Sequence, residues 1–119
     1  MLISQTMLTA NATGDVLNRA VAECEGLKTF PYVLKDGWKR FEPNQDRHMA
    51  EPIIERAGIS FAYDEAAPEG HRHIAIRRHG PRGRTVARGP DLLIAAMRCR
   101  VASEIGDTII LPHTAPVFC

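Results

Sequence analysis

Two of the five histidines could contribute to metal chemistry. His71 and His73 are two positions apart, so on a strand both side chains would point to the same side and offer half of a metal site. Distant candidates for further ligands are His48, His79, His113 and Cys119, but nothing in the spacing identifies a third ligand, and the neighbouring arginines would repel a cation. We therefore predict a solvated strand face at these histidines and no bound metal.

The three cysteines lack the neighbours that would activate a thiol. Cys24 and Cys99 fall on apolar sides of two predicted helices, where free cysteine behaves as a small hydrophobic residue. Cys119 stands at the end of the chain with no adjacent basic residue. Phosphate-binding glycine loops and zinc-finger patterns are missing as well. The sequence thus predicts no catalytic residue and no cofactor, and a small enzyme of unknown class is the weakest functional hypothesis.

The basic segment 71–88 is the most specific indication of binding. It holds six arginines and no acidic residue, and two strands joined by a Gly-Pro-Arg-Gly turn are predicted there. Because arginine can bind phosphate through two parallel hydrogen bonds, the segment offers candidate phosphate or nucleic-acid contacts. These candidates are Arg77, Arg78, Arg82, Arg84 and Arg88. The same charges are typical of edge strands that avoid pairing with other molecules, and no aromatic residue is present to stack on bases. Both interpretations stay open.

Length and composition point to a single domain over residues 1–119. A net charge of +1 gives no whole-chain attraction to nucleic acid or to a membrane. No apolar run approaches the roughly 20 residues of a membrane span, and the first residues do not resemble a secretory signal. Three cysteines without a disulfide framework favour a reducing compartment, so we expect a cytoplasmic protein.

Hydrophobic periodicity and turn residues predict an α+β domain. The expected elements are a helix over 15–25, a hairpin over 29–42, strands over 59–63, 71–77 and 84–88, a helix over 90–105 and a strand over 107–111. Residues 1–12 have weak patterning and are expected to be frayed or only partly docked. Residues 52–58 form either one helical turn or an irregular crossing segment. We predict two helices packed on one face of a mainly antiparallel sheet of about four to six short strands.

The helix over 90–105 is predicted to be buried on two sides. At 100° per residue one face carries bulky side chains such as Met97 and Val101, and nearly the opposite face carries the small residues Ala95 and Cys99. We expect the bulky face to lie on the sheet and the small-residue face to contact another helix. The first helix is the favoured neighbour, but a second copy of the chain is also open, so the protein is either a monomer or a homodimer.

Three blocks of the sequence resemble one family of small bacteriophage and prophage proteins, the NinX type. They are Thr13–Leu17 with Ala20–Gly26, Pro52–Ile59, and Gly89-Pro90 with Leu93–Cys99, Val101–Ser103 and Gly106–Pro112. The chain departs from the family pattern at Arg19, where an aromatic residue is common, and at Glu51, where glycine usually precedes Pro52. The segment 71–88 lies between the matching blocks, so the resemblance lends no support to nucleic-acid binding there.

The resemblance implies a short protein that works in the cytoplasm of the bacterial host and is encoded among phage accessory genes. The family has no established activity, cofactor or catalytic residues. Together with the absence of reactive groups, this favours an accessory protein that acts by binding a host or phage protein. A nucleic-acid-binding module that uses segment 71–88 is the alternative.

Overall fold

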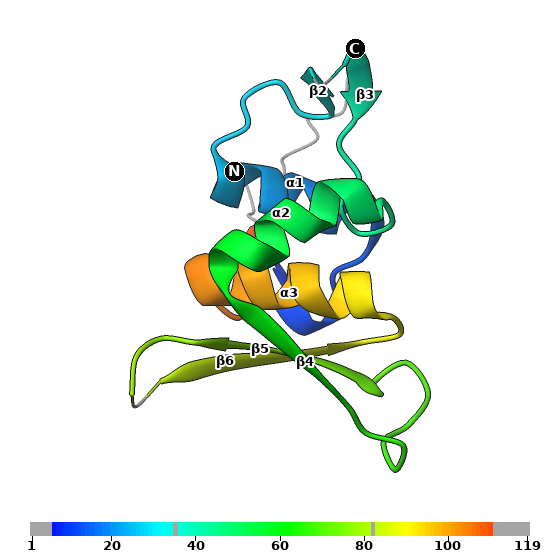
Figure 1. The fold of residues 1–119 in the computed structure, drawn as a ribbon, viewed down its shortest axis with the longest axis vertical. Coiled ribbons are helices and arrows are strands. Elements are labelled where there is room, and N and C mark those ends of the chain that lie inside the picture. The colour runs from blue at the N-terminus through cyan, green and yellow to red at the C-terminus, as the bar shows by residue number, and fades with distance from the viewer. Residues whose placement is uncertain (1–5, 35, 82, 111–119) are drawn as a thin grey trace, which may run out of the picture.

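The structure, a computed structural model, describes residues 6–34, 36–81 and 83–110. Within these ranges the chain forms three α-helices, one 3-10 helix and seven strands, which confirms the α+β class (Figure 1). The elements are β1 (Thr6–Leu8), η1 (Thr9–Asn11), α1 (Gly14–Glu25), β2 (Tyr32–Leu34), β3 (Trp38–Arg40), α2 (Arg47–Ala57), β4 (Ile59–Tyr63), β5 (His73–Arg78), β6 (Arg84–Gly89), α3 (Leu92–Glu104) and β7 (Thr108–Ile110). No helix in these ranges is long and apolar enough to cross a bilayer.

The helices and the main sheet form layers, with α3 in the middle. Strands β4, β5 and β6 make an antiparallel sheet, α3 lies on one face of it, and α1 and α2 lie on the far side of α3 (Figure 1). The predicted packing of two helices directly on a sheet is therefore wrong. Three helices are present, and α3 separates α1 from the sheet. Helix α1 does contact α3, but on its bulky side and not on the small-residue face for which it was predicted.

The small-residue face of α3 lies on the sheet, opposite to the predicted orientation. The Cys99 thiol donates to the Thr85 carbonyl oxygen at 3.6 Å. A Cβ added to Gly89 would stand 2.8 Å from the backbone nitrogen of Ala95. Small residues on both elements thus allow the helix backbone to approach β6 closely. By helical spacing, the bulky side chains of Met97 and Val101, both fully buried, fall on the side of α1 and α2.

Helix α2 corrects the expectation for residues 52–58. Asp46 caps it by accepting a hydrogen bond from the His48 backbone N–H at 3.0 Å, and Gly58 ends it in the left-handed conformation. Pro52 lies inside the helix. The helix was missed because proline in an interior position ordinarily ends a helix. Its first turns are also polar, and only Ala50 and Ile53 are buried along its length.

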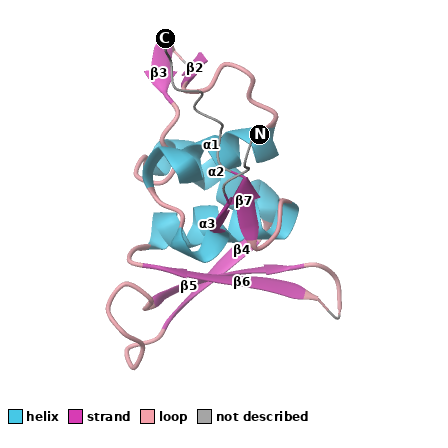
Figure 2. Ribbon diagram, turned by 180° about the vertical axis from the view of Figure 1, so that it is seen from behind, coloured by secondary structure: helices cyan, strands magenta, loops and turns pink. Residues whose placement is uncertain are grey.

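Two small sheets account for the remaining strands. β1 pairs with β7 beside α3 (Figure 2), and β2 pairs with β3 as the expected hairpin. The predicted single sheet of four to six strands is replaced by sheets of two, two and three strands. Residues 6–12, expected to be frayed or partly docked, contribute β1 and η1, and Thr9 and Ala12 are buried. Residues 1–5 and 111–119 lie outside the described ranges.

Candidate functional site

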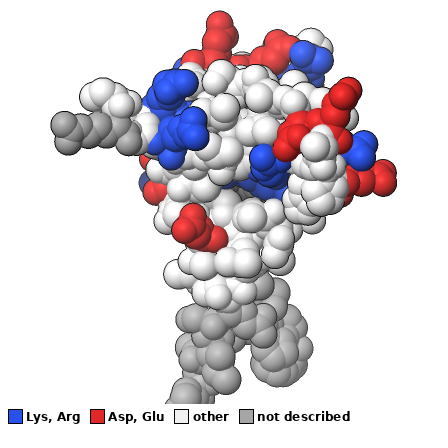
Figure 3. Space-filling model, turned by 90° about the horizontal axis from the view of Figure 1, so that it is seen from below, with Lys and Arg blue, Asp and Glu red and all other residues white. Residues whose placement is uncertain are grey.

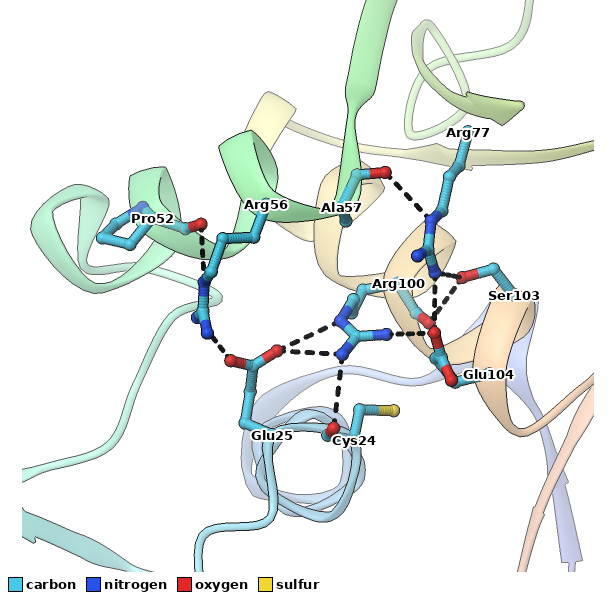
Figure 4. A network of polar contacts seen from close by, with 9 residues as sticks. All are labelled: Cys24, Glu25, Pro52, Arg56, Ala57, Arg77, Arg100, Ser103 and Glu104. Carbon is cyan, nitrogen blue, oxygen red and sulfur yellow. Dashed lines mark hydrogen bonds and ion pairs between the residues drawn. The ribbon is translucent and has the colours of Figure 1, made fainter. Parts of the chain in front are cut away.

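Arg77, the first of the candidate phosphate contacts, is used inside the fold. Its side chain lies on the α3 side of β5 and donates to the Ala57 carbonyl oxygen at 2.9 Å and to the Ser103 hydroxyl at 2.8 Å (Figure 4). It also pairs with Glu104 at 2.8 Å. These contacts join β5 to the end of α2 and to α3. The geometry gives Arg77 a structural role.

The other arginines of the β5–β6 hairpin are distributed unequally. Arg88 pairs with Asp64 at 3.3 Å and donates to the His71 carbonyl oxygen. Arg78 and Arg84 lie directly opposite one another near the hairpin end, are exposed, and pair with no carboxylate in the described ranges. Arg82 lies outside those ranges. Only Arg78 and Arg84 therefore combine exposure with freedom from an ion pair among the described candidates.

The outer face of the β4–β5–β6 sheet is largely uncharged at its centre. Seen from that side, white atoms cover much of the face, and Lys and Arg atoms lie in separate groups around it, several of them next to Asp and Glu atoms (Figure 3). Strand alternation places Ile74, Ile76 and Val86 on this face, because Ala75 between them is fully buried against α3. Val86 is exposed.

Glu25 connects the three helices through two arginines, and Glu104 extends this network to β5 (Figure 4). Glu25 of α1 pairs with Arg56 of α2 and with Arg100 of α3, the latter at 3.1 Å. Arg100 also pairs with Glu104 at 2.7 Å. The hydrogen bond from Arg77, followed by the contribution of Arg100, lowers the pKa of Glu104. The network thus fixes charged side chains of α1, α2, α3 and β5 relative to one another.

The described thiols and histidines do not form a reactive centre. Burial raises the pKa of Cys24 and that of Cys99 to about 11, so both stay protonated at neutral pH. His73 packs edge-on against Tyr63 with ring centroids 5.1 Å apart, and His71 lines a cleft elsewhere. Groups of three potential metal ligands are missing from the part of the chain that the structure covers. Cys119 lies outside it.

The β2–β3 hairpin carries a cluster of exposed apolar side chains that the sequence analysis did not single out. Tyr32, Leu34 and Trp38 lie on the same face of the hairpin and are 47%, 64% and 62% exposed. In Figure 1 the hairpin projects from the helices at the end of the molecule opposite the main sheet. The sequence did contain a signal for this cluster, namely large apolar residues that alternate on both sides of the Asp36-Gly37 turn. In a hairpin that pairs with no other strand, such residues share one face and can remain uncovered.

A cleft between η1, β6 and α3 contains a second feature that sequence reasoning missed. Its volume is about 490 Å³, and Arg98 of α3 lines it although only 5% of that residue is exposed. Arg98 donates to the carbonyl oxygens of Ala12 and Arg88, both at 2.9 Å. The sequence signal for a buried charge was a single arginine inside the apolar run Ala95–Cys99. Because the helix is covered on two sides, that arginine must be buried as well.

Comparison with known proteins settles the family. The family model described as "Bacteriophage P22, NinX" matches residues 8–104. The chain belongs to this family. No curated protein matches the chain.

The NinX match includes both features described above. It spans the β2–β3 hairpin and the Arg98 cleft except for Asp107, and it also contains the whole β5–β6 hairpin. The match ends at the last residue of α3, before β7. The family match indicates a phage context. Evidence about binding comes from the two hairpins and the Arg98 cleft.

Proposed function

We propose that the protein is a phage accessory protein that acts by binding another protein, and that the β2–β3 hairpin carries the contact. The observation behind this proposal is the apolar cluster Tyr32, Leu34 and Trp38 on one projecting face. Exposed apolar clusters of this kind often mark interaction sites, and tryptophan and tyrosine are enriched among the residues that contribute most to binding.

The base of the hairpin is anchored in a way that suits a binding surface. Phe41, next to β3, is buried, and its ring packs edge-on against Phe30 with centroids 6.5 Å apart. The backbone N–H of Phe41 donates to the Pro31 carbonyl oxygen at 2.8 Å. A fixed base reduces the conformational entropy that the hairpin would lose on binding. The exposed face of Tyr32, Leu34 and Trp38 is thus held in position by other residues, at the base of the hairpin.

The expected partner is a host or phage protein that presents an apolar groove with a protruding side chain. A shallow hollow of about 540 Å³, lined by Thr29, Tyr32 and Trp38, can receive such a side chain. The cytoplasm of the bacterial host is where this contact would form. Apolar contacts of this type persist at high salt, because they do not depend on long-range charge attraction.

The first experiment compares proteins captured from host lysate, with and without phage infection, by three forms of the full chain. The wild-type chain and Tyr63→Ser, a matched change at an exposed aromatic residue of β4, should retain the same partner. The double variant Leu34→Ser with Trp38→Ser should lose it. A partner retained equally by the double variant, or repeated failure to capture any specific protein, would contradict the proposal.

A second measurement uses the purified partner and the single tryptophan of the chain. Binding that covers Trp38 should shift its fluorescence emission to shorter wavelength. Leu34→Ser keeps the tryptophan and should weaken binding roughly tenfold or more, as expected for an apolar anchor. An unchanged spectrum at saturation would place the contact elsewhere on the molecule.

Nucleic-acid binding by the β5–β6 hairpin is the second candidate function. It is favoured by the exposed pair Arg78 and Arg84, whose like charges face each other without a carboxylate among the described residues. Arg82 adds a third charge by sequence. Shift assays with DNA and RNA at two salt concentrations should show weaker binding at higher salt. Binding that survives replacement of Arg78, Arg82 and Arg84 by alanine would exclude this function for the hairpin.

A further inference from the structure

We infer that the cleft between η1, β6 and α3 binds a small oxyanion, a carboxylate or phosphate group carried on an apolar body, and that Arg98 meets its charge. This site is distinct from the β2–β3 hairpin and does not depend on the protein-binding proposal. It rests on the surroundings of one buried guanidinium.

Among the described residues, Arg98 is a buried charge without a matching acid. Its Nε and Nη1 atoms donate to backbone carbonyl oxygens of Ala12 and Arg88, while Nη2 has no hydrogen-bond acceptor among the described residues. No carboxylate in those residues forms an ion pair with it. Buried charges in proteins are ordinarily paired, because two neutral carbonyl groups replace only part of the lost hydration.

The position of Arg98 makes its charge reachable. The residue is 5% exposed and forms part of the wall of a cleft of about 490 Å³, a volume in the usual range for small-molecule sites. Burial lowers the pKa of Arg98, and the more distant Asp91 acts in the opposite direction. An oxyanion in the cleft would supply the missing opposite charge.

The other lining groups define the class of ligand. Leu8, Ala87 and Ala102 give the cleft apolar walls, which suit a hydrocarbon body. Thr9, Asn11 and His71 add polar groups.

Two charged residues besides Arg98 line the cleft. Arg88 is partly occupied by its ion pair with Asp64. Asp107 is the carboxylate among the described lining residues, so the anionic part of the ligand is expected on the Arg98 side. An apolar molecule with one oxyanion therefore fits better than a highly charged one.

A purely structural role is the competing explanation for Arg98. The residue joins the segment before α1, through Ala12, to β6, through Arg88, and a brace of this kind would need no ligand. The two explanations predict different measurements. A brace affects the stability of the free protein, whereas a ligand site gives a saturable response that maps to the cleft.

The test is an NMR titration of the full-length, isotope-labelled protein at constant ionic strength. The probes are phenyl phosphate and benzoate, with inorganic phosphate to test whether the apolar body is needed and benzyl alcohol as the neutral analogue. We expect saturable shifts at residues 8–11, 86–88 and 98 with at least one of the two aromatic anions. Inorganic phosphate should bind more weakly, and benzyl alcohol should give no saturable shift. Whichever aromatic anion binds more tightly identifies the group that the site prefers.

Two variants separate the site from general charge effects. Arg98→Met should weaken binding of the preferred anion roughly tenfold or more, because a charge-assisted hydrogen bond is lost while the side-chain volume is largely kept. Arg84→Gln, an equal loss of charge near the other end of β6, should bind as the wild type does. If Arg98→Met does not fold, Arg88→Gln takes its place and should weaken binding several-fold. Absence of saturable shifts in the wild type, shifts outside the cleft, or equal binding by wild type and the cleft variant would overturn the inference.

Discussion

The two hairpins β2–β3 and β5–β6 are held in place in different ways. The β5–β6 hairpin lies in a three-stranded sheet, and Arg77 connects it to α2 and α3. The β2–β3 hairpin forms a separate sheet and is fixed at its base, where Phe41 is buried. The β5–β6 hairpin has most of the charge, and the β2–β3 hairpin has the large apolar residues without a partner.

This difference shows why a run of charged residues is a weak guide to a binding surface. On a strand next to a helix, alternate side chains point into the protein, so half of a basic segment becomes available for internal contacts. Arg77 follows that rule, and Arg78 beside it does not face α3. A projecting hairpin has no such second layer. The exposed apolar residues of the β2–β3 hairpin have no such layer against them, which is why we propose a role in binding for them.

The largest expected effect separates the base of the β2–β3 hairpin from its outer face. Phe41→Ala should lower the free energy of unfolding by about 3 kcal/mol, because it empties a buried aromatic position. Trp38→Ala should lower it by less than about 1 kcal/mol, since the side chain is mostly exposed. Urea unfolding followed by circular dichroism measures both. A comparable loss for Trp38→Ala would show that the exposed face is needed for folding.

The attachment of β6 to α3 can be broken at one glycine. Gly89→Ala should destabilise the protein by about 1–3 kcal/mol, because the new Cβ would stand 2.8 Å from a backbone nitrogen of α3 and a main-chain shift is required. Gly83→Ala near the hairpin end is the control, because its new Cβ would lie an ordinary 3.5 Å from the Cβ of His79. It should change stability by no more than about 0.5 kcal/mol. Equal unfolding midpoints for the two variants would mean that β6 can move away from α3 at little cost.

The sequence predicted the elements whose signals are local. The period of α1 and the left-handed Gly26 at its end are in the structure, and so is the β2–β3 hairpin with Asp36 and Gly37 at positive φ. The burial of α3 on two sides is also confirmed. These features depend on patterns within about a dozen residues, which a single sequence carries in full.

The packing of these elements against one another was harder to predict from the sequence. Small and bulky faces of α3 were both recognised, but which one meets the sheet depends on Gly89, a residue of another element. Helix α2 was missed because Pro52 lies inside it and its first turns are polar. The Arg98 cleft combines residues from η1, β6 and α3. Its outline could not be predicted from spacing, although the charge of Arg98 inside the apolar run Ala95–Cys99 was a signal present in the sequence.

A smaller effect distinguishes two neighbouring arginines of β5. Arg77→Ala should cost about 1–2 kcal/mol, because it removes several hydrogen bonds at a partly buried position, including those to Ala57 and Ser103. Arg78→Ala should cost less than about 0.5 kcal/mol, since the side chain is exposed. Thermal unfolding of the two variants at matched ionic strength makes the comparison. Similar losses would remove the contrast between inward and outward arginines.

The smallest expected effect concerns the anchor of the β5–β6 hairpin at acid pH. Arg77 and Arg100 lower the pKa of Glu104 in the folded protein below its ordinary value of 4.5. Ionised Glu104 therefore contributes stability that is fully present above the unfolded pKa and is lost as pH falls through the folded pKa. Because its side chain is 44% exposed, Glu104→Gln should cost no more than about 1 kcal/mol at pH 7. The difference from wild type should shrink below pH 4.5. Glu65→Gln in the exposed loop after β4 serves as control and should follow the wild-type curve. A gap between Glu104→Gln and wild type that stays constant down to low pH would show that packing, not charge, explains the loss.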